Sequence, residues 1–298
     1  MSFLRPVDCP RCGAPLPPDA IGASVATCPY CDGTLAADPR VVWAAKYERA
    51  LEAPEDRDDL VLVGARPYFL EGLVAEGESS DVHLARRATT PTERVILKVP
   101  RTPADAGRLA HEWSVLEALH DSDTLGATHF SRLLPQLVER GAFADPRPAC
   151  GGSASGSQIA SVMRFADGFV HTLVDVRTAF GDGLDPRHAA WIWRRALELL
   201  TFVHHAGYEH GALHPEHLLL HARDHGVMFV GFSKAAPLVD PSRDLQTLAE
   251  TISSLCPLPA PLAAVAATPC ADAWHLVTLV KQAARECFGP PRYVSLRL

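Results

Sequence analysis

The chain has 298 residues, 47% of them hydrophobic, with a net charge of −7 and a pI near 6.0. This length and apolar content predict a globular protein of about two domains. The acidic balance disfavours nucleic acid and anionic lipid as partners. No apolar run approaches the ~18 residues of a membrane span, and no secretory leader pattern opens the chain, so the expected location is cytoplasmic.

Four of the eight cysteines lie near the start of the chain in a C-x2-C-x15-C-x2-C pattern. These are Cys9, Cys12, Cys28 and Cys31. The spacing is typical of two knuckles that hold one tetrahedral zinc ion, and four thiolates make a closed, structural site. The alternative is two reduced or disulfide-bonded pairs without metal. We expect a zinc ribbon over residues 1–38 and a helical, charged linker over residues 39–59.

The other four cysteines, at positions 150, 256, 270 and 287, have no such spacing and are expected to be buried thiols.

Residues 60–298 begin with several strand-like runs. Strands are expected at 67–75, 80–87, 93–99, 136–139 and 158–163, and a helix at about 103–120. A Gly/Ser-rich loop separates the last two strands, around residues 144–157. A longer helix over 196–208 ends at Gly207.

Two later segments carry chemically informative residues. The first runs from His210 to Leu220 with the sequence HGALHPEHLLL, and the second is VGFS, from Val230 to Ser233. Together with the earlier strands and helices, these segments resemble, in order and spacing, the eukaryotic-like protein-kinase fold. The resemblance implies an α+β, two-lobed architecture over residues 60–298, with an antiparallel N-lobe sheet, a helix C and a mainly helical C-lobe.

The resemblance assigns a residual nucleotide cleft in the N-lobe. RVILKV aligns with the V-A-I-K strand and makes Lys98 the phosphate lysine, with Glu112 as its helix-C partner. Gly77 is the one glycine left of the G-x-G-x-x-G loop, and Met163 takes the gatekeeper position before the hinge.

In the same alignment, the residues that carry out catalysis in kinases are replaced. Ala212 stands where H-R-D has the base, and His217 and Gly231 stand where the two magnesium ligands belong. Asp244 matches the helix-F aspartate and follows Gly231 closely, with no A-P-E motif between them. Such a chain resembles a pseudokinase. Magnesium and ATP are not favoured as cofactors, and Lys98 with Glu112 is more simply an ion pair that ties helix C to the sheet.

Acidic residues at the predicted phosphate loop also disfavour ATP as a cofactor. Glu76, Glu78 and Asp81 would lie where a triphosphate sits. Two unit charges ~6 Å apart repel by roughly 3 kcal/mol at an effective dielectric near 20.

Seven histidines, at positions 204, 205, 210, 214, 217, 221 and 225, could in principle ligate a metal. Hydrogen-bonded histidines are the simpler interpretation.

Three functions remain open. We favour a scaffold or allosteric regulatory subunit that works through a protein partner. The alternative is a divergent nucleotide-dependent phosphotransferase, whose metal would need Glu216, His217 or the loop carboxylates as ligands. A nucleic-acid-binding ribbon is weakest, because residues 1–40 carry three arginines against four aspartates.

Overall fold

The computed structural model describes residues 26–27, 34–35, 60–88, 92–145 and 158–298. The chain divides into two compact units, Met1–Arg57 and Asp58–Leu298. In the first unit the described residues are two short antiparallel strands, β1 (Ala26–Thr27) and β2 (Thr34–Leu35). The four cysteines predicted to bind zinc, the predicted linker and most of the Gly/Ser-rich loop lie outside the described residues.

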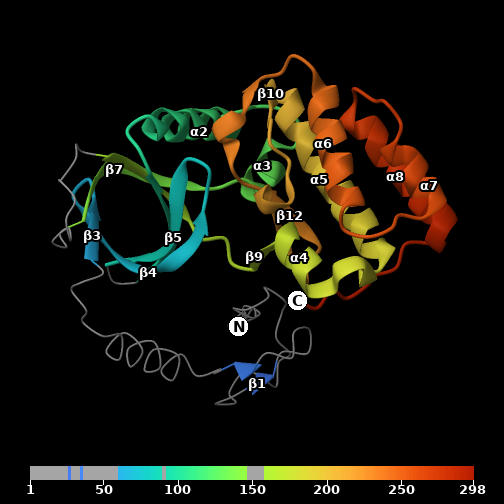
Figure 1. Ribbon diagram of the computed structural model, residues 1–298, viewed down its shortest axis with the longest axis horizontal. Coiled ribbons are helices and arrows are strands. Elements are labelled where there is room, and N and C mark those ends of the chain that lie inside the picture. Colours follow the sequence, from blue (N-terminus) through green and yellow to red (C-terminus); the bar gives the residue numbers. More distant parts are fainter. Residues whose placement is uncertain (1–25, 28–33, 36–59, 89–91, 146–157) are drawn as a thin grey trace, which may run out of the picture. The chain divides into compact units, whose positions relative to one another are not determined.

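The second unit begins with six antiparallel strands that close into a barrel, in the order β3-β4-β5-β6-β8-β7 (Figure 1). They are β3 (Leu60–Val63), β4 (Arg66–Glu76), β5 (Ser80–Arg87), β6 (Arg94–Pro100), β7 (Leu137–Ala144) and β8 (Gln158–Arg164). The strands predicted at 67–75, 80–87, 93–99 and 158–163 are confirmed. The strand predicted at 136–139 extends to Ala144.

The closure of the sheet was not expected from the sequence. Leu62 and Val63 of β3 pair with Ala144 and Phe143 of β7. This pairing brings two backbones close together: a Cβ on Gly141 would lie 2.8 Å from the amide nitrogen of Gly64. A glycine at position 141 therefore permits the contact that closes the barrel.

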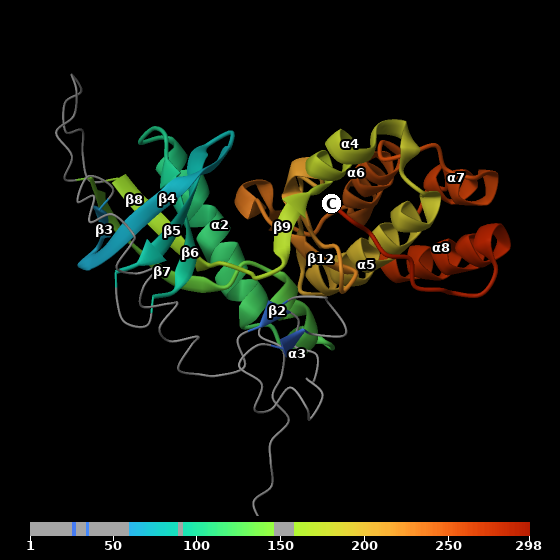
Figure 2. The ribbon, with the colours of Figure 1, turned by 90° about the horizontal axis from the view of Figure 1, so that it is seen from below.

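Strand β6 shows how the sequence sets the barrel interior. Val95 and Leu97 are fully buried among the apolar residues of neighbouring strands, while Ile96 packs against the main core on the other side. Alternation along a strand sends Lys98 to the same side as Ile96. Helix α2 (Asp105–His120) packs on that side, against β6, β7 and β8 (Figure 2).

The C-terminal lobe is mainly helical, as expected. Its helices are α3 (Ala127–Phe130), α4 (Leu173–Phe180), α5 (Pro186–His205), α6 (Pro241–Ser253), α7 (Ala260–Ala266) and α8 (Ala273–Phe288). Short 3-10 turns cover η3 (Ser131–Leu133), η4 (Gly181–Gly183), η5 (Pro215–His217) and η6 (Phe232–Lys234).

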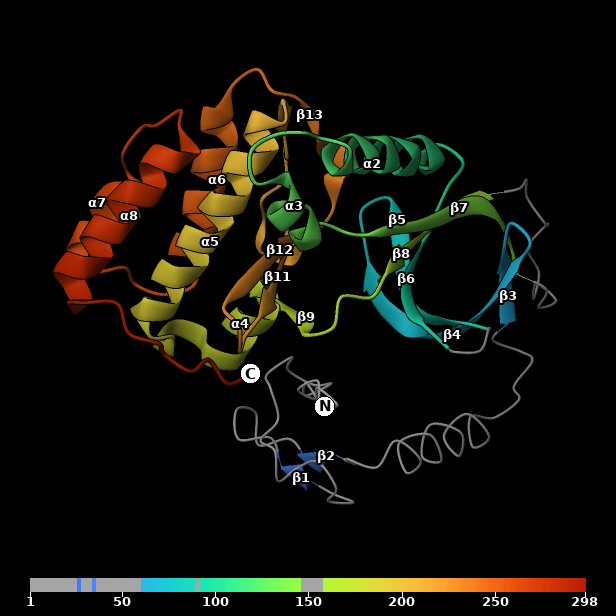
Figure 3. The ribbon, with the colours of Figure 1, turned by 180° about the vertical axis from the view of Figure 1, so that it is seen from behind.

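Helix α5 is the centre of this lobe, with α8 packed beside it (Figure 3). Asp185 caps its first turn by accepting the amide of Arg187, and Pro186 supplies a preset first helical residue. The helix ends just before Gly207, whose φ of +87° suits glycine. Trp193 and Leu197 are fully buried along it, and burial of a leucine side chain contributes roughly 1.5–3 kcal/mol.

Two small sheets complete the lobe. Strands β9 (Phe169–Thr172), β11 (Leu218–His221) and β12 (Gly226–Phe229) form one, and β10 (Tyr208–Glu209) pairs with β13 (Ala236–Pro237) in the other. No helix in the part of the chain that the structure describes is both long enough and apolar enough to cross a membrane.

Candidate functional site

A buried ion pair joins the two predicted cleft residues. Lys98 Nζ of β6 lies 2.5 Å from Glu112 Oε2 of α2, and the Glu112 side chain is 1% exposed. The other carboxylate oxygen of Glu112 accepts the backbone amide of Phe232, at 3.2 Å. One carboxylate therefore ties together the barrel, α2 and the segment that follows Gly231.

The sequence explains why Glu112 is buried. On α2 the buried residues Leu109, Val115, Leu116 and Leu119 share one face with Glu112, at helical spacing. A carboxylate on such a face needs partners, because an unpaired buried charge is costly. Lys98 and the Phe232 amide are those partners.

The two positions that the resemblance assigns to magnesium ligands lie in direct contact. Gly231 has φ of +80°, and a Cβ built on it would lie 2.6 Å from Cδ2 of His217. His217 Nδ1 is 2.7 Å from the carbonyl oxygen of Ala212. A carbonyl can only accept, so Nδ1 carries the proton. The imidazole ring occupies the space that any side chain at position 231 would need.

Asp244 of α6 anchors the backbone of the loop that carries Ala212. The buried carboxylate accepts the backbone amides of His210 at 2.7 Å and Gly211 at 2.9 Å, and lies 3.0 Å from His204 Nε2. Burial alone would raise the pKa of Asp244, but the hydrogen bonds from His204 and the two amides outweigh it and hold that pKa below its ordinary value.

His210 is held in one neutral form. Its Nε2 lies 3.1 Å from the carbonyl oxygen of Val230, to which it donates, while Nδ1 accepts the amide of Ala212 at 3.3 Å. Complete burial lowers the pKa of His210 to about 3. Its ring packs against Phe232, with centroids 4.4 Å apart. His210 thus links the loop at Ala212 to the Val230–Phe232 segment.

The β4–β5 turn stands where the phosphate loop was predicted. Gly77 donates its amide to the Ser80 carbonyl at 2.9 Å, which closes the turn. The acidic side chains here each have a cationic partner. Glu76 and Asp81 pair with Arg101 at 3.8 and 2.7 Å, and Glu78 lies 2.6 Å from Lys234 Nζ. The mutual repulsion expected from the sequence is therefore largely offset within the chain itself.

Several of the clustered histidines have hydrogen-bond partners besides those at the loop. His221 accepts the amide of Asp224 at 3.2 Å. His225 lies between Trp191 and Tyr293 in a ring stack, with Nε2 2.9 Å from the Val294 carbonyl. Within the described ranges no three His, Cys, Asp or Glu side chains are grouped so as to hold a metal ion.

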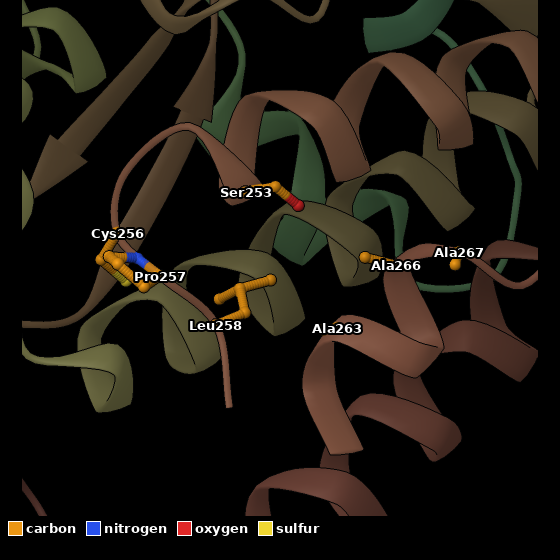
Figure 4. Close-up of a pocket in the computed structure, with 7 residues that line it drawn as sticks. All are labelled: Ser253, Cys256, Pro257, Leu258, Ala263, Ala266 and Ala267. Atoms are coloured by element: carbon orange, nitrogen blue, oxygen red, sulfur yellow. The ribbon is translucent and has the colours of Figure 1, made fainter. Parts of the chain in front are cut away.

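Met163, predicted as gatekeeper, lies on β8 opposite Ile96 and is 4% exposed within the main core. Two pockets lie elsewhere, in the C-terminal lobe. The first, of about 360 Å³, lies at the end of α6 and along α7 (Figure 4). The second, of about 370 Å³, is lined by α4 and Ser254. Neither pocket is lined by Lys98, Glu112 or His217.

Comparison with known proteins supports the fold. No protein-family model matches the sequence, and no curated protein is similar enough to match. Among solved structures, the chain is similar to the crystal structure of the BubR1 kinase domain, with a TM-score of 0.56 and 11% sequence identity. The match covers 83% of this chain and 92% of that one. The fold is therefore kinase-like, as the sequence predicted.

Proposed function

We propose that this chain is a catalytically inactive pseudokinase that works through protein contacts, as a scaffold or an allosteric regulatory subunit. The observation that carries the proposal is the packing of His217 against Gly231. A carboxylate at position 231 would need the volume that the imidazole fills, because a Cβ alone would come within 2.6 Å of the ring. In kinases these two positions hold the magnesium ions that neutralise the triphosphate.

The chain keeps the contacts that give such a fold its shape. Asp244 anchors the backbone of the loop, and Glu112 joins α2 to both lobes. Between η6 and α6 there is room only for β13 and a short connection, since Lys234 is followed by Pro241 after six residues. The long loop on which kinases bind peptide substrates has no counterpart here.

The alternative, a divergent phosphotransferase, would need new metal ligands. Glu216 is exposed on η5, while Glu78 and Asp81 are each engaged by a cation. Using either loop carboxylate would require its ion pair to break. These contacts favour the inactive interpretation.

The N-terminal cysteines extend the proposal to a second module. A ribbon with one zinc ion on Cys9, Cys12, Cys28 and Cys31 would supply a binding surface for the partner. This surface would depend on the metal, because about 38 residues cannot bury enough apolar area to fold without it. The partner is expected to be a protein.

Affinity purification from the native cell tests whether the ribbon makes the contact with the partner. A specific protein partner should be recovered with wild-type chain and with Lys98→Ala, and lost with Cys9→Ser combined with Cys12→Ser. If the cysteine variant recovers the partner as well as wild type does, the ribbon is not the contact surface. If no specific partner is recovered at all, the scaffold proposal is wrong.

A further inference from the structure

The tip of the β4–β5 hairpin is joined electrostatically to two other elements. Glu78 Oε2 lies 2.6 Å from Lys234 Nζ of η6, and Glu78 Oε1 lies 3.5 Å from Arg108 Nη1 of α2. These contacts connect a turn of the N-terminal lobe with the segment that directly follows Gly231. Glu78 thus bridges two cations that come from different lobes.

On its β4 side, packing contributes little to holding the outer part of this hairpin, whereas β5 is paired with β6 as far as Ser80, which is 5% exposed. Residues 71–76 of β4 are exposed, and Leu73 and Val74 are 52% and 59% exposed. The neighbouring acidic residues Glu76 and Asp81 pair with Arg101, which belongs to the same lobe. They therefore cannot tie the hairpin to the C-terminal lobe, whereas Glu78 does.

The three side chains of the bridge lie in water. Glu78, Lys234 and Arg108 are 63%, 49% and 52% exposed. Hydrogen bonding and charge from Lys234, followed by the charge of Arg108, hold the pKa of Glu78 below its ordinary value. Exposed ion pairs are individually weak and are screened by salt.

We propose that Glu78, Lys234 and Arg108 form a reversible electrostatic latch that holds the tip of the β4–β5 hairpin against η6. Breaking these ion pairs releases the tip, while β5 stays paired with β6 and the buried Lys98–Glu112 pair keeps α2 on the barrel.

The lobes are also joined by the hydrogen bond from the Phe232 amide to Glu112 and by the contact of His111 Nε2 with the Ala235 carbonyl oxygen at 2.6 Å, neither of which depends on the latch. The latch operates whether or not the chain transfers phosphate.

Hydrogen exchange of the full-length protein tests the latch. At low salt, amides of residues 73–79 should exchange several-fold faster in Glu78→Gln than in wild type. Raising the salt from about 0.05 M to about 0.5 M should accelerate exchange in wild type and have little further effect in the variant. The matched control is Glu76→Gln, which removes a neighbouring exposed carboxylate that pairs within its own lobe, and it should behave as wild type.

A charge reversal separates the latch from general loosening. Lys234→Glu should increase exchange at the hairpin tip as Glu78→Gln does. Combining it with Glu78→Lys restores an ion pair of reversed polarity and should recover part of the protection. Recovery should be incomplete, because Arg108 repels a lysine at position 78. Zero-length carbodiimide cross-linking reports the contact directly, through a Glu78–Lys234 amide whose yield should fall several-fold at high salt. Equal exchange in Glu78→Gln and Glu76→Gln, or a cross-link yield unaffected by salt, would overturn the proposal.

Discussion

At the scale of single residues, His217 fills the space beside Gly231 that a side chain would need. A left-handed φ and a ring 2.6 Å from the missing Cβ are separate obstacles to a side chain at this position. Gly207 offers a control, because its φ is +87° but nothing lies within 4 Å of its Cβ position.

Alanine substitution should therefore cost more at position 231 than at position 207. We expect Gly207→Ala to lower the free energy of unfolding by about 1–2 kcal/mol, from backbone strain alone. Gly231→Ala should cost clearly more, because the imidazole must also move. In a His217→Ala background the cost of Gly231→Ala should fall to about that of Gly207→Ala, as measured by denaturant unfolding. Equal costs in the wild-type background would contradict the contact.

The Lys98–Glu112 pair makes a second residue-scale prediction. Lys98→Met leaves the Glu112 carboxylate buried without its cation, which should destabilise the fold by about 3 kcal/mol. Adding Glu112→Gln removes the charge and keeps an acceptor for the Phe232 amide, so the double variant should recover much of the loss. Thermal and urea unfolding check this. A double variant less stable than Lys98→Met would show that the carboxylate charge is not the cause.

Titration of His210 and Asp244 predicts how stability depends on pH. The pKa of His210 falls from an ordinary 6.5 to about 3, and that of Asp244 is also lowered, so the unfolded chain binds protons more readily than the folded one. Stability should fall as the pH drops below about 6.5, by about 1.4 kcal/mol per pH unit for each such proton. Burial lowers the pKa of His188 and His225 too, which adds to the slope.

Unfolding measured between about pH 6.5 and 4 tests this. His210→Gln should reduce the slope of the unfolding free energy against pH by as much as the contribution of one proton, because glutamine does not titrate. A slope unchanged by His210→Gln would place the titration elsewhere.

At the scale of elements, the strands and helices with the strongest periodicity were predictable. Strand β6 is a short run rich in β-branched apolar residues, and α2 has a clear buried face, so both could be placed from sequence within a few residues. Lys98 and Glu112 lie on these elements, and their pairing followed from the kinase resemblance. Asp244, which the sequence matched to the helix-F aspartate, lies on α6 and accepts the backbone amides of His210 and Gly211.

Short and non-local elements were not predictable. Strands β9, β11 and β12 have four residues each, too few for a clear period, and β9 pairs with β11 from a distant part of the chain. Closure of the barrel depends on a close backbone approach at Gly141, which has no sequence signature of its own. The Glu78–Lys234 contact joins residues more than 150 positions apart, so sequence showed only the acidic loop and not its cations.

The zinc ribbon is predicted to be a metal-dependent element. Elemental analysis of purified protein should find about one zinc per chain, and chelation should unfold residues 1–38 while the kinase-like unit keeps its own thermal transition. A metal-free ribbon that still resists proteolysis would reject the site.

At the scale of the whole molecule, the kinase-like unit has a frame that a few buried carboxylates hold together. Glu112 and Asp244 each fix several elements at once, and both are buried. By contrast, Ala212, His217 and Gly231 supply no carboxylate, either at the position of the H-R-D aspartate or as a ligand for magnesium. Losing metal ligands removes more than a general base, which typically contributes 10²- to 10⁴-fold.

Transfer of phosphate from labelled ATP, with magnesium present, tests the central claim most directly. We predict no transfer to the protein itself or to general protein substrates above the level given by Lys98→Ala, which controls for a contaminating kinase. Transfer by the wild-type protein that disappears in Lys98→Ala would show that the cleft is catalytic, and would contradict the pseudokinase proposal.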